Sequence, residues 1–194
     1  MLTILATTLI AATGPMGVVK AADSDVQVVL QKDATIEKLA TVADKYIDFV
    51  ELAKRALGKK EWDKLDKKKQ EDFSATMKGL LRASYAQKAL GDGKNGAKFE
   101  YVGEKIEKDE ATVTATLVVK DDKFPVTYKL YRADAKSEWK IFDVITDDVS
   151  LVSTYADQFR KLIANKGFDG LLSSLKAKKE QLEKPAEAAG SAGK

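Results

Sequence analysis

Asp143 is the residue whose type and setting most suggest chemistry. It lies in the apolar segment Trp139–Ile145, on the same side as Ile141, so it should be partly buried, and a buried carboxylate needs a partner. One interpretation makes it a general base in a pocket closed by Tyr128 or Tyr155. The other makes it a structural acid that accepts backbone or Arg donors at a sheet edge. We favour the structural role, because structural networks also contain buried acids.

The composition restricts the chemistry further. The 194 residues include no Cys and no His, which excludes disulfides, thiolate nucleophiles, zinc-finger sites and His-based triads. The 33 Lys and Arg residues nearly balance the 30 Asp and Glu residues, so the chain lacks the concentrated positive charge of a nucleic-acid-binding protein. Asp121-Asp122 and Asp147-Asp148 are predicted turn residues, because neither pair has the ligand spacing of a calcium loop. We therefore expect no catalytic residue, no metal and no nucleic-acid partner.

The N-terminus has the pattern of an export signal. Residues 2–12 carry no charge, and Val19-Lys20-Ala21 offers small residues at the positions that a signal peptidase reads. The uncharged run is about half of the roughly 20 residues that a membrane-spanning helix needs. We therefore expect a cleaved signal over residues 1–21, one domain over residues 22–184 and a disordered tail over residues 185–194.

The spacing of apolar residues predicts helices on both sides of a group of strands. Steps of three and four residues predict one helix over 36–57 that ends at Gly58, and another that ends near Gly91. The same spacing returns after residue 151 in two helices separated at Gly167. Alternation with a period of two predicts four strands with short turns between them, at roughly 98–107, 111–119, 124–132 and 138–146. The polar residues 23–34 are expected to be a lead-in.

This order of elements is typical of an α+β domain in which helices cover one face of a curved four-stranded antiparallel sheet. Its apolar residues are numerous enough either to fill a core or to line a cavity, and periodicity does not distinguish the two. Three functions stay open at this point. They are a binding protein with a hollow interior, a small-molecule enzyme that uses Asp143 as its base, and an adaptor with a solid core.

A set of positions that are not generic core residues is shared with a known family. In the C-terminal half these positions are Trp139–Val144, Val149–Val152, Tyr155, Gln158-Phe159 and Gly167–Leu172. In the N-terminal half they are Ala53-Lys54-Arg55, Leu57-Gly58, Trp62, Gln70, Phe73, Leu80-Leu81 and Tyr85, and Pro125-Val126 fits the third strand. Together they span residues 35–180 and resemble the MlaC family, also called the toluene-tolerance family, of periplasmic phospholipid carriers.

The resemblance implies a nuclear-transport-factor-like fold with a deep apolar pocket for acyl chains. The implied protein is a periplasmic monomer that carries phospholipid, as ligand and not as cofactor, between an inner-membrane ABC transporter complex and an outer-membrane lipoprotein complex. The predicted lipid-binding residues are the inward sides of the helices and the sheet: Phe49, Ala53, Phe73, Met77, Leu81, Tyr85, Leu117, Val126, Tyr128, Ile141, Phe142, Val149, Val152, Tyr155 and Phe159.

Two positions depart from the family pattern. Asp148 stands where the family usually has Gly, and Ala156 follows Tyr155 where the family usually has Arg. If that Arg steadies a headgroup or a partner, either Arg160 or Lys161 replaces it here or the ligand preference has shifted. The basic run Lys67–Lys69 is expected to lie on a solvated helix face.

Overall fold

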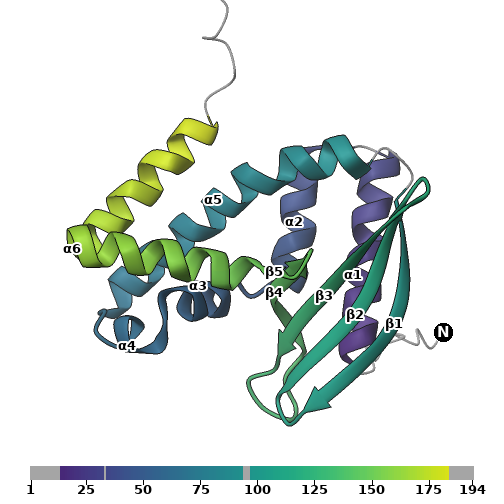
Figure 1. Ribbon diagram of the computed structural model, residues 1–194, viewed down its shortest axis with the longest axis horizontal. Helices are drawn as coiled ribbons and strands as arrows, with labels where there is room; N and C mark the ends of the chain where they lie inside the picture. The colour runs from purple at the N-terminus through teal and green to yellow at the C-terminus, as the bar shows by residue number, and fades with distance from the viewer. Residues whose placement is uncertain (1–13, 33, 94–96, 184–194) are drawn as a thin grey trace, which may run out of the picture.

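The computed structural model describes residues 14–32, 34–93 and 97–183 (Figure 1). In these ranges a group of helices precedes a set of strands, and a long helix follows them. The helices are α1 (Pro15–Lys32), α2 (Ile36–Tyr46), α3 (Phe49–Leu57), α4 (Lys59–Trp62), α5 (Lys67–Gly93) and α6 (Leu151–Glu183). The strands are β1 (Lys98–Glu107), β2 (Glu110–Val119), β3 (Asp122–Tyr131), β4 (Lys140–Thr146) and β5 (Val149–Ser150). The predicted α+β class is confirmed.

The strands form one antiparallel sheet in the order β1-β2-β3-β4-β5. The four predicted strands are present, but the sheet has five strands and not four. The additional strand, β5, contains only Val149 and Ser150, too few residues for alternation to reveal. In β2 and β3, Ala115 lies opposite Val126 and Val113 lies opposite Tyr128. This apolar face packs against α1 and α2 (Figure 1).

The predicted single helix over residues 36–57 is wrong, because the chain leaves the helical conformation between α2 and α3. Ile47 forms a parallel bridge with Ile141 of β4, and the Asp48 amide donates to the Ile141 carbonyl at 2.9 Å. The Asp48 carboxylate then caps α3 by accepting from the amides of Val50 and Glu51. The break therefore attaches the helices to the edge of the sheet.

The predicted interruption at Gly167 is present as a sharp kink within α6. Gly167 has φ 66° and ψ −178°, a combination with positive φ that glycine adopts at little cost. After the kink, α6 runs back along α5, and Lys179 packs against Gly79. Leu171 and Leu175 are buried there, so both halves of α6 belong to one helical layer beside β4.

Most of the predicted lead-in, residues 23–34, is helical instead, because residues 23–32 belong to α1. Helix α1 begins at Pro15, and Val18 and Val19 are buried against the sheet. The predicted signal boundary after Ala21 therefore falls inside this helix. The rest of the predicted signal, residues 1–13, lies outside the described residues, as does the predicted tail. The boundary stays a prediction.

The burial of α1 makes the effect of a cut after Ala21 measurable. A chain that begins at Ala22 lacks Val18, Val19 and the Met16 amide, which donates to Glu104 at 2.9 Å. Because each buried Val contributes about 1.5–3 kcal/mol, we expect the free energy of unfolding to fall by about 3 kcal/mol or more relative to a chain that begins at Gly14. Urea unfolding of both chains measures the difference, and equal stabilities would show that the start of α1 is dispensable.

Candidate functional site

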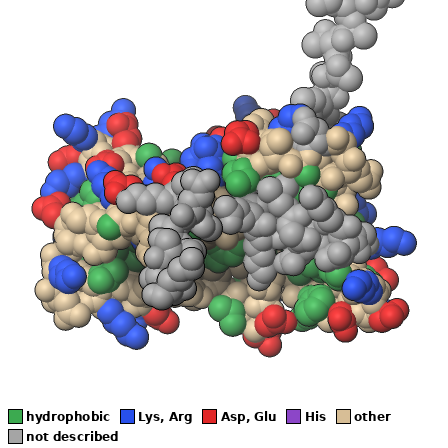
Figure 2. Space-filling model, turned by 90° about the horizontal axis from the view of Figure 1, so that it is seen from above, with side chains coloured by type: hydrophobic (Ala, Val, Ile, Leu, Met, Phe, Trp, Pro, Cys, Tyr) green, Lys and Arg blue, Asp and Glu red, His purple; other side chains and the backbone are tan. Residues whose placement is uncertain are grey.

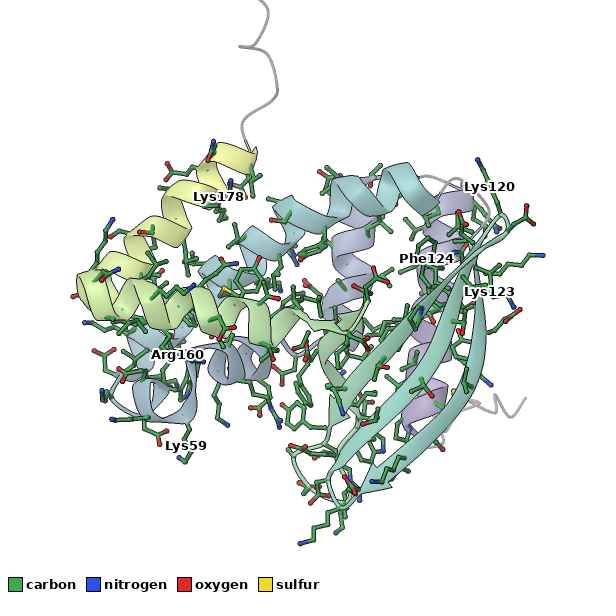
Figure 3. The ribbon with its side chains drawn as sticks, in the orientation of Figure 1. Lys59, Lys120, Lys123, Phe124, Arg160 and Lys178 are labelled. Carbon is green, nitrogen blue, oxygen red and sulfur yellow. The ribbon has the colours of Figure 1, made fainter. Side chains whose placement is uncertain are left out.

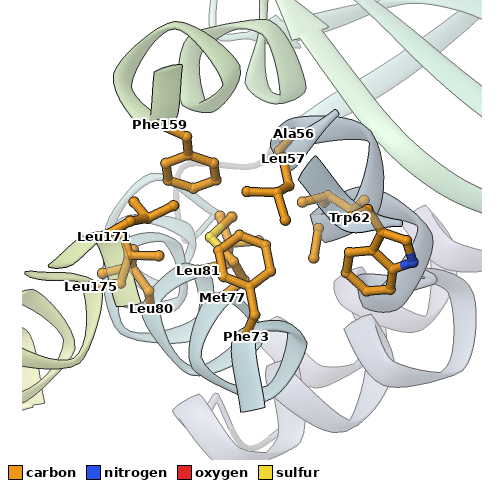
Figure 4. Packing of buried hydrophobic residues seen from close by; sticks show 12 residues of the cluster. Ala56, Leu57, Trp62, Phe73, Met77, Leu80, Leu81, Phe159, Leu171 and Leu175 are labelled. Carbon is orange, nitrogen blue, oxygen red and sulfur yellow. The ribbon is translucent and has the colours of Figure 1, made fainter. Parts of the chain in front are cut away.

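The first group of predicted contact residues packs into a cluster between α3, α4, α5 and α6, here called the helical cluster (Figure 4). Its buried members are Leu52, Ala53, Ala56, Leu57, Trp62, Phe73, Met77, Leu80, Leu81, Phe159, Leu171 and Leu175. Phe73 and Met77 are 0% exposed, and the Phe73 ring meets Phe159 edge-on at 5.6 Å between centroids. Ala53, Phe73, Met77, Leu81 and Phe159 thus pack against neighbouring side chains at the centre of this cluster.

A second cluster lies between the sheet and the helices α1 and α2, and is here called the sheet cluster. Its buried members are Val18, Val19, Tyr46, Ala111, Val113, Ala115, Val126, Tyr128, Leu130, Trp139 and Ile141. Three of the predicted sheet contacts, Val126, Tyr128 and Ile141, belong to it, and Leu117 is partly buried at its margin. The predicted wall of the pocket is therefore divided between two cores.

The two clusters meet along a boundary that we call the seam, defined by Ile47, Tyr85, Val144, Val152 and Tyr155. Ile47 packs against both clusters, Val144 against the sheet cluster, and Val152 and Tyr155 against the helical cluster. Burial raises the pKa of Tyr155 to about 12, and the nearby Tyr85 contributes to this shift. Tyr85 itself is 48% exposed. The seam thus offers apolar surface that neither core has fully covered.

Three predicted contact residues lie away from the seam. The Phe142 ring is buried beneath the Arg55 guanidinium, with 3.8 Å from Cζ to the ring centroid. Phe49 is partly buried at the margin of the helical cluster, where Lys78 Nζ lies 5.6 Å from its ring centroid. Val149 is 58% exposed in β5. Cations lie over both aromatic rings, and the lipid contacts predicted for these three residues stay predictions.

Asp143 has the structural role that the sequence favoured. Ser150 Oγ donates to one carboxylate oxygen at 2.6 Å, and the Val152 amide donates to the other at 3.0 Å. Ser150 Oγ in turn accepts from the Ser153 amide at 3.0 Å. The carboxylate therefore helps to cap α6 and fixes its first turn to β4.

A second carboxylate, that of Asp23 in α1, was not singled out from the sequence. It accepts from the Tyr101 hydroxyl at 2.9 Å and the Tyr128 hydroxyl at 3.2 Å. Burial raises the pKa of the Asp23 carboxyl to about 6, although these two hydrogen bonds act to lower it. The carboxyl lines a groove of about 630 Å³ between α1 and β1 that also contains Lys20 and Lys98. Its partners are 78 and 105 residues away in the chain, so no local motif could reveal the cluster.

Another groove, here called the α2–α5 groove, lies close to the seam. It has a volume of about 540 Å³ and is lined by Ile36, Glu37, Ala40, Thr41, Arg82, Ala83, Leu182 and Glu183. These residues come from α2, α5 and the end of α6. Arg82 and Tyr85 are three positions apart on α5, and residues at this spacing share a helix face. Arg82 of the groove and Tyr85 of the seam are therefore neighbours on α5.

The charged surface does not form a field of one sign. Figure 2 shows Lys and Arg side chains interspersed with Asp and Glu along the rim of one face. In the predicted basic run, Lys67 pairs with Glu71 and Lys69 with Asp169, which fits the predicted solvated helix face. Lys120, Lys123 and the 40% exposed Phe124 lie at or near the β2–β3 turn (Figure 3), and Lys123 pairs with Glu100.

Within residues 14–32, 34–93 and 97–183, every helix is too short or too polar to cross a membrane. The same ranges contain no group of three or more carboxylates placed to hold a metal ion. The arrangement is thus one of apolar cores, a partly open seam and two grooves with polar margins.

Comparison with known proteins gives a family match over most of the chain. The model of the MlaC protein family matches residues 19–177. The chain belongs to the MlaC family. A solved structure from Ralstonia solanacearum, described as a phospholipid-binding protein in complex with a phospholipid, has the same fold. It superposes with a TM-score of 0.76 at 23% sequence identity, covering 86% of this chain and 97% of that chain. No curated protein matches the chain.

The two positions at which the sequence is expected to depart from the family pattern, Asp148 and Ala156, have different structural settings. Asp147 and Asp148 form the turn between β4 and β5, with φ of 50° and 60°, a conformation that glycine adopts more readily. A glycine at position 148 therefore suits this turn, and Asp148 occupies it under mild strain. Near Ala156, the Arg160 side chain is 77% exposed and pairs with Asp157 (Figure 3). Arg160 is thus a solvent-exposed residue that pairs within its own helix.

The structural role of Asp143 predicts a loss of stability without it. In the variant Asp143→Ala, the Ser150 hydroxyl and the Val152 amide lose their acceptor, which costs about 2 kcal/mol. We expect the free energy of unfolding to fall by this amount in urea titration. Asp157→Ala, which removes an exposed i,i+3 ion pair, is the control and should cost less than about 0.5 kcal/mol. Equal effects of the two variants would contradict the capping role.

The raised pKa of Asp23 predicts a pH-dependent stability. Because the folded protein binds this proton more tightly than the unfolded chain, its contribution is fully present below the unfolded pKa of 3.8 and is lost as the pH rises through about 6. We expect Asp23→Asn to be more stable than the unchanged protein at pH 7.5, by on the order of 2 kcal/mol, and the advantage to vanish near pH 4. Urea unfolding at both pH values measures it. A pH-independent difference would show that Asp23 titrates normally.

Proposed function

We propose that this MlaC-family protein is a periplasmic carrier that binds the acyl chains of phospholipid and moves the lipid between membrane complexes. The observation that carries the proposal is the family match over residues 19–177. The fold shared with a protein described in complex with a phospholipid supports it. The partners are an ABC transporter complex in the inner membrane and a lipoprotein complex in the outer membrane, and the carrier works as a monomer.

Elementary energetics explains why such a carrier is needed. Each acyl methylene removed from water contributes about 0.8 kcal/mol, so a two-chain lipid faces a barrier on the order of 20 kcal/mol to crossing an aqueous compartment. An apolar sleeve removes that barrier without any catalytic group. The same energy would prevent release if the protein kept all of it, so docking to a membrane complex must widen the site or offer a competing apolar channel.

The acyl chains are assigned to the seam and not to the centre of either cluster. Phe73 and Met77 are 0% exposed and already contact other side chains, so a tail among them would displace a packed core. Tyr85 is 48% exposed, and Val152 and Tyr155 are partly buried beside it on α6. A tail laid along these side chains gains burial without a loss of existing contacts.

A catalytic function has less support. Both oxygens of Asp143 accept hydrogen bonds that cap α6, so the carboxylate is occupied by the fold. The perturbed carboxyl of Asp23 accepts from two tyrosines, which also orients it toward the sheet. Lipid binding uses the apolar surface at the seam and requires neither group.

The location of the site predicts which substitutions reduce bound lipid. Val152→Trp fills the seam with a larger side chain, and Tyr85→Glu places a charge at an exposed position of it. We expect native mass spectrometry of protein from a bacterial periplasm to show bound phospholipid in the unchanged protein and at least fivefold less in either variant. Val102→Trp is the matched control, because Val102 is 72% exposed on β1, and its lipid content should not change.

The measurements distinguish a failure of the carrier function from a wrong placement of the tails. Circular dichroism verifies that each variant is folded, and Tyr85→Glu tests the site even if Val152→Trp does not fold, because Tyr85 is at the surface. Lipid-free unchanged protein would overturn the carrier function. Normal lipid content in both folded variants would overturn the placement of the tails at the seam.

A further inference from the structure

The α2–α5 groove contains an arginine whose hydrogen-bonding capacity is incompletely used. Arg82 Nη2 donates to the Asp44 carboxylate, which also pairs with Lys78 at 2.9 Å. Arg82 Nε is buried and has no hydrogen-bond partner. A buried N–H group without an acceptor costs about 1–3 kcal/mol, and in native proteins such a group usually meets a ligand, ion or water. Arg82 also lines the groove, so a small movement of this side chain would let an acceptor in the groove reach the unsatisfied N–H group.

The same groove also presents a carboxylate without a cation. Glu37, in the first turn of α2, lines the groove, and its carboxylate forms no ion pair or hydrogen bond within the described part of the chain. Glu183, on the other side, pairs with Lys179 at 3.0 Å. Ile36, Ala40, Ala83 and Leu182 supply an apolar lining between these charged groups. The lining therefore combines one unfilled donor, one unpaired acceptor and apolar surface.

These charges match a dipolar ligand better than an anionic one. A phosphate oxygen satisfies Arg82 Nε–H by a charge-assisted hydrogen bond, and a primary ammonium satisfies Glu37. A headgroup with a negative charge and no amine leaves Glu37 unpaired and meets a second carboxylate at Glu183. A volume of about 540 Å³ is within the range of small-molecule sites.

We propose that the α2–α5 groove is the headgroup subsite of the carrier and that it selects zwitterionic phospholipids with a primary amine. Arg82 Nε–H donates to the phosphate, and the Glu37 carboxylate accepts from the ammonium. This inference rests on the proposed function, because it requires a lipid whose tails lie at the seam. Arg82 of the groove and Tyr85 of the seam are about one helical turn apart on α5, roughly 5 Å along the helix axis. One phospholipid can therefore place its headgroup in the groove and its tails at the seam.

Arg82 has a closely matched control in the same helix. Lys78 lies one turn earlier on α5, pairs with the same Asp44 carboxylate, and its side chain is 35% exposed, as is that of Arg82. Lys78 does not line the groove. A change in lipid selection that appears in an Arg82 variant and not in Lys78→Met thus reports the groove and not the loss of a pair with Asp44.

The test is a competition between two headgroups on equal chains. Delipidated full-length protein is incubated with vesicles of phosphatidylethanolamine and phosphatidylglycerol in equal amounts, reisolated, and analysed by mass spectrometry for total lipid and for the ratio of the two. The unchanged protein should take up phosphatidylethanolamine in excess. Arg82→Lys and Glu37→Gln should each reduce that excess about tenfold, the effect of one hydrogen bond to a charged group, while Lys78→Met leaves it unchanged.

The results distinguish a failure of the headgroup subsite from a failure of the carrier function. If the unchanged protein takes up no lipid, the carrier function and the subsite both fail. If it takes up lipid at a ratio near one, or if Lys78→Met lowers the ratio as much as Arg82→Lys, the subsite is wrong and the carrier function stands. Arg82→Lys keeps the positive charge beside Asp44 and is the variant expected to fold, and Glu37 is exposed on α2, so Glu37→Gln tests the amine contact independently.

Discussion

The division of the apolar residues into two closed cores is the constraint on which the rest of the structure depends. The helical cluster and the sheet cluster each contain side chains with no exposed surface, such as Phe73 in one and Val113 in the other. They are joined at the edge of β4 by polar contacts: the amide of Asp48 on Ile141, and the capping of α6 by Asp143. Because most buried contacts lie within one cluster or the other, widening the seam between them would disturb fewer contacts than opening either core.

The periodicity of the sequence predicts the elements that are long and amphipathic. The strands β1 to β4, the helix α5 and the kink at Gly167 all follow from local spacing. Helix α1 does not, because its polar residues are used in contacts with distant parts of the chain: Asp23 binds Tyr101 and Tyr128, and Asp25 binds Tyr46. The break at Ile47 is equally nonlocal, since its cause is a bridge to Ile141. In α1 and at Ile47, hydrogen bonds to distant parts of the chain therefore determine the structure more than the local spacing of apolar residues does.

Periodicity also limits what the sequence can predict about the candidate site. Periodicity identifies the buried face of a helix but does not say whether that face meets a side chain or a ligand. Met77 and Phe159 were therefore predicted to contact lipid, and in the structure both pack in the helical cluster. Phe142 was assigned in the same way and lies under Arg55. Of the predicted residues, Tyr85 of α5 and Val152 and Tyr155 in the first turns of α6 lie at the seam.

The energetics of transport favours a site that holds tails and reads headgroups by separate means. The apolar transfer energy of two chains is on the order of 20 kcal/mol, and a wholly enclosed site would retain nearly all of it. In the proposed carrier the tails lie at the seam, where Tyr85 is 48% exposed, so part of each tail stays near the surface and less of this energy opposes release. A headgroup contact that changes affinity tenfold contributes about 1.4 kcal/mol, enough to rank competing lipids but too little to decide whether one is released. In the proposed carrier, selection between headgroups in the groove therefore need not slow the release of the tails from the seam.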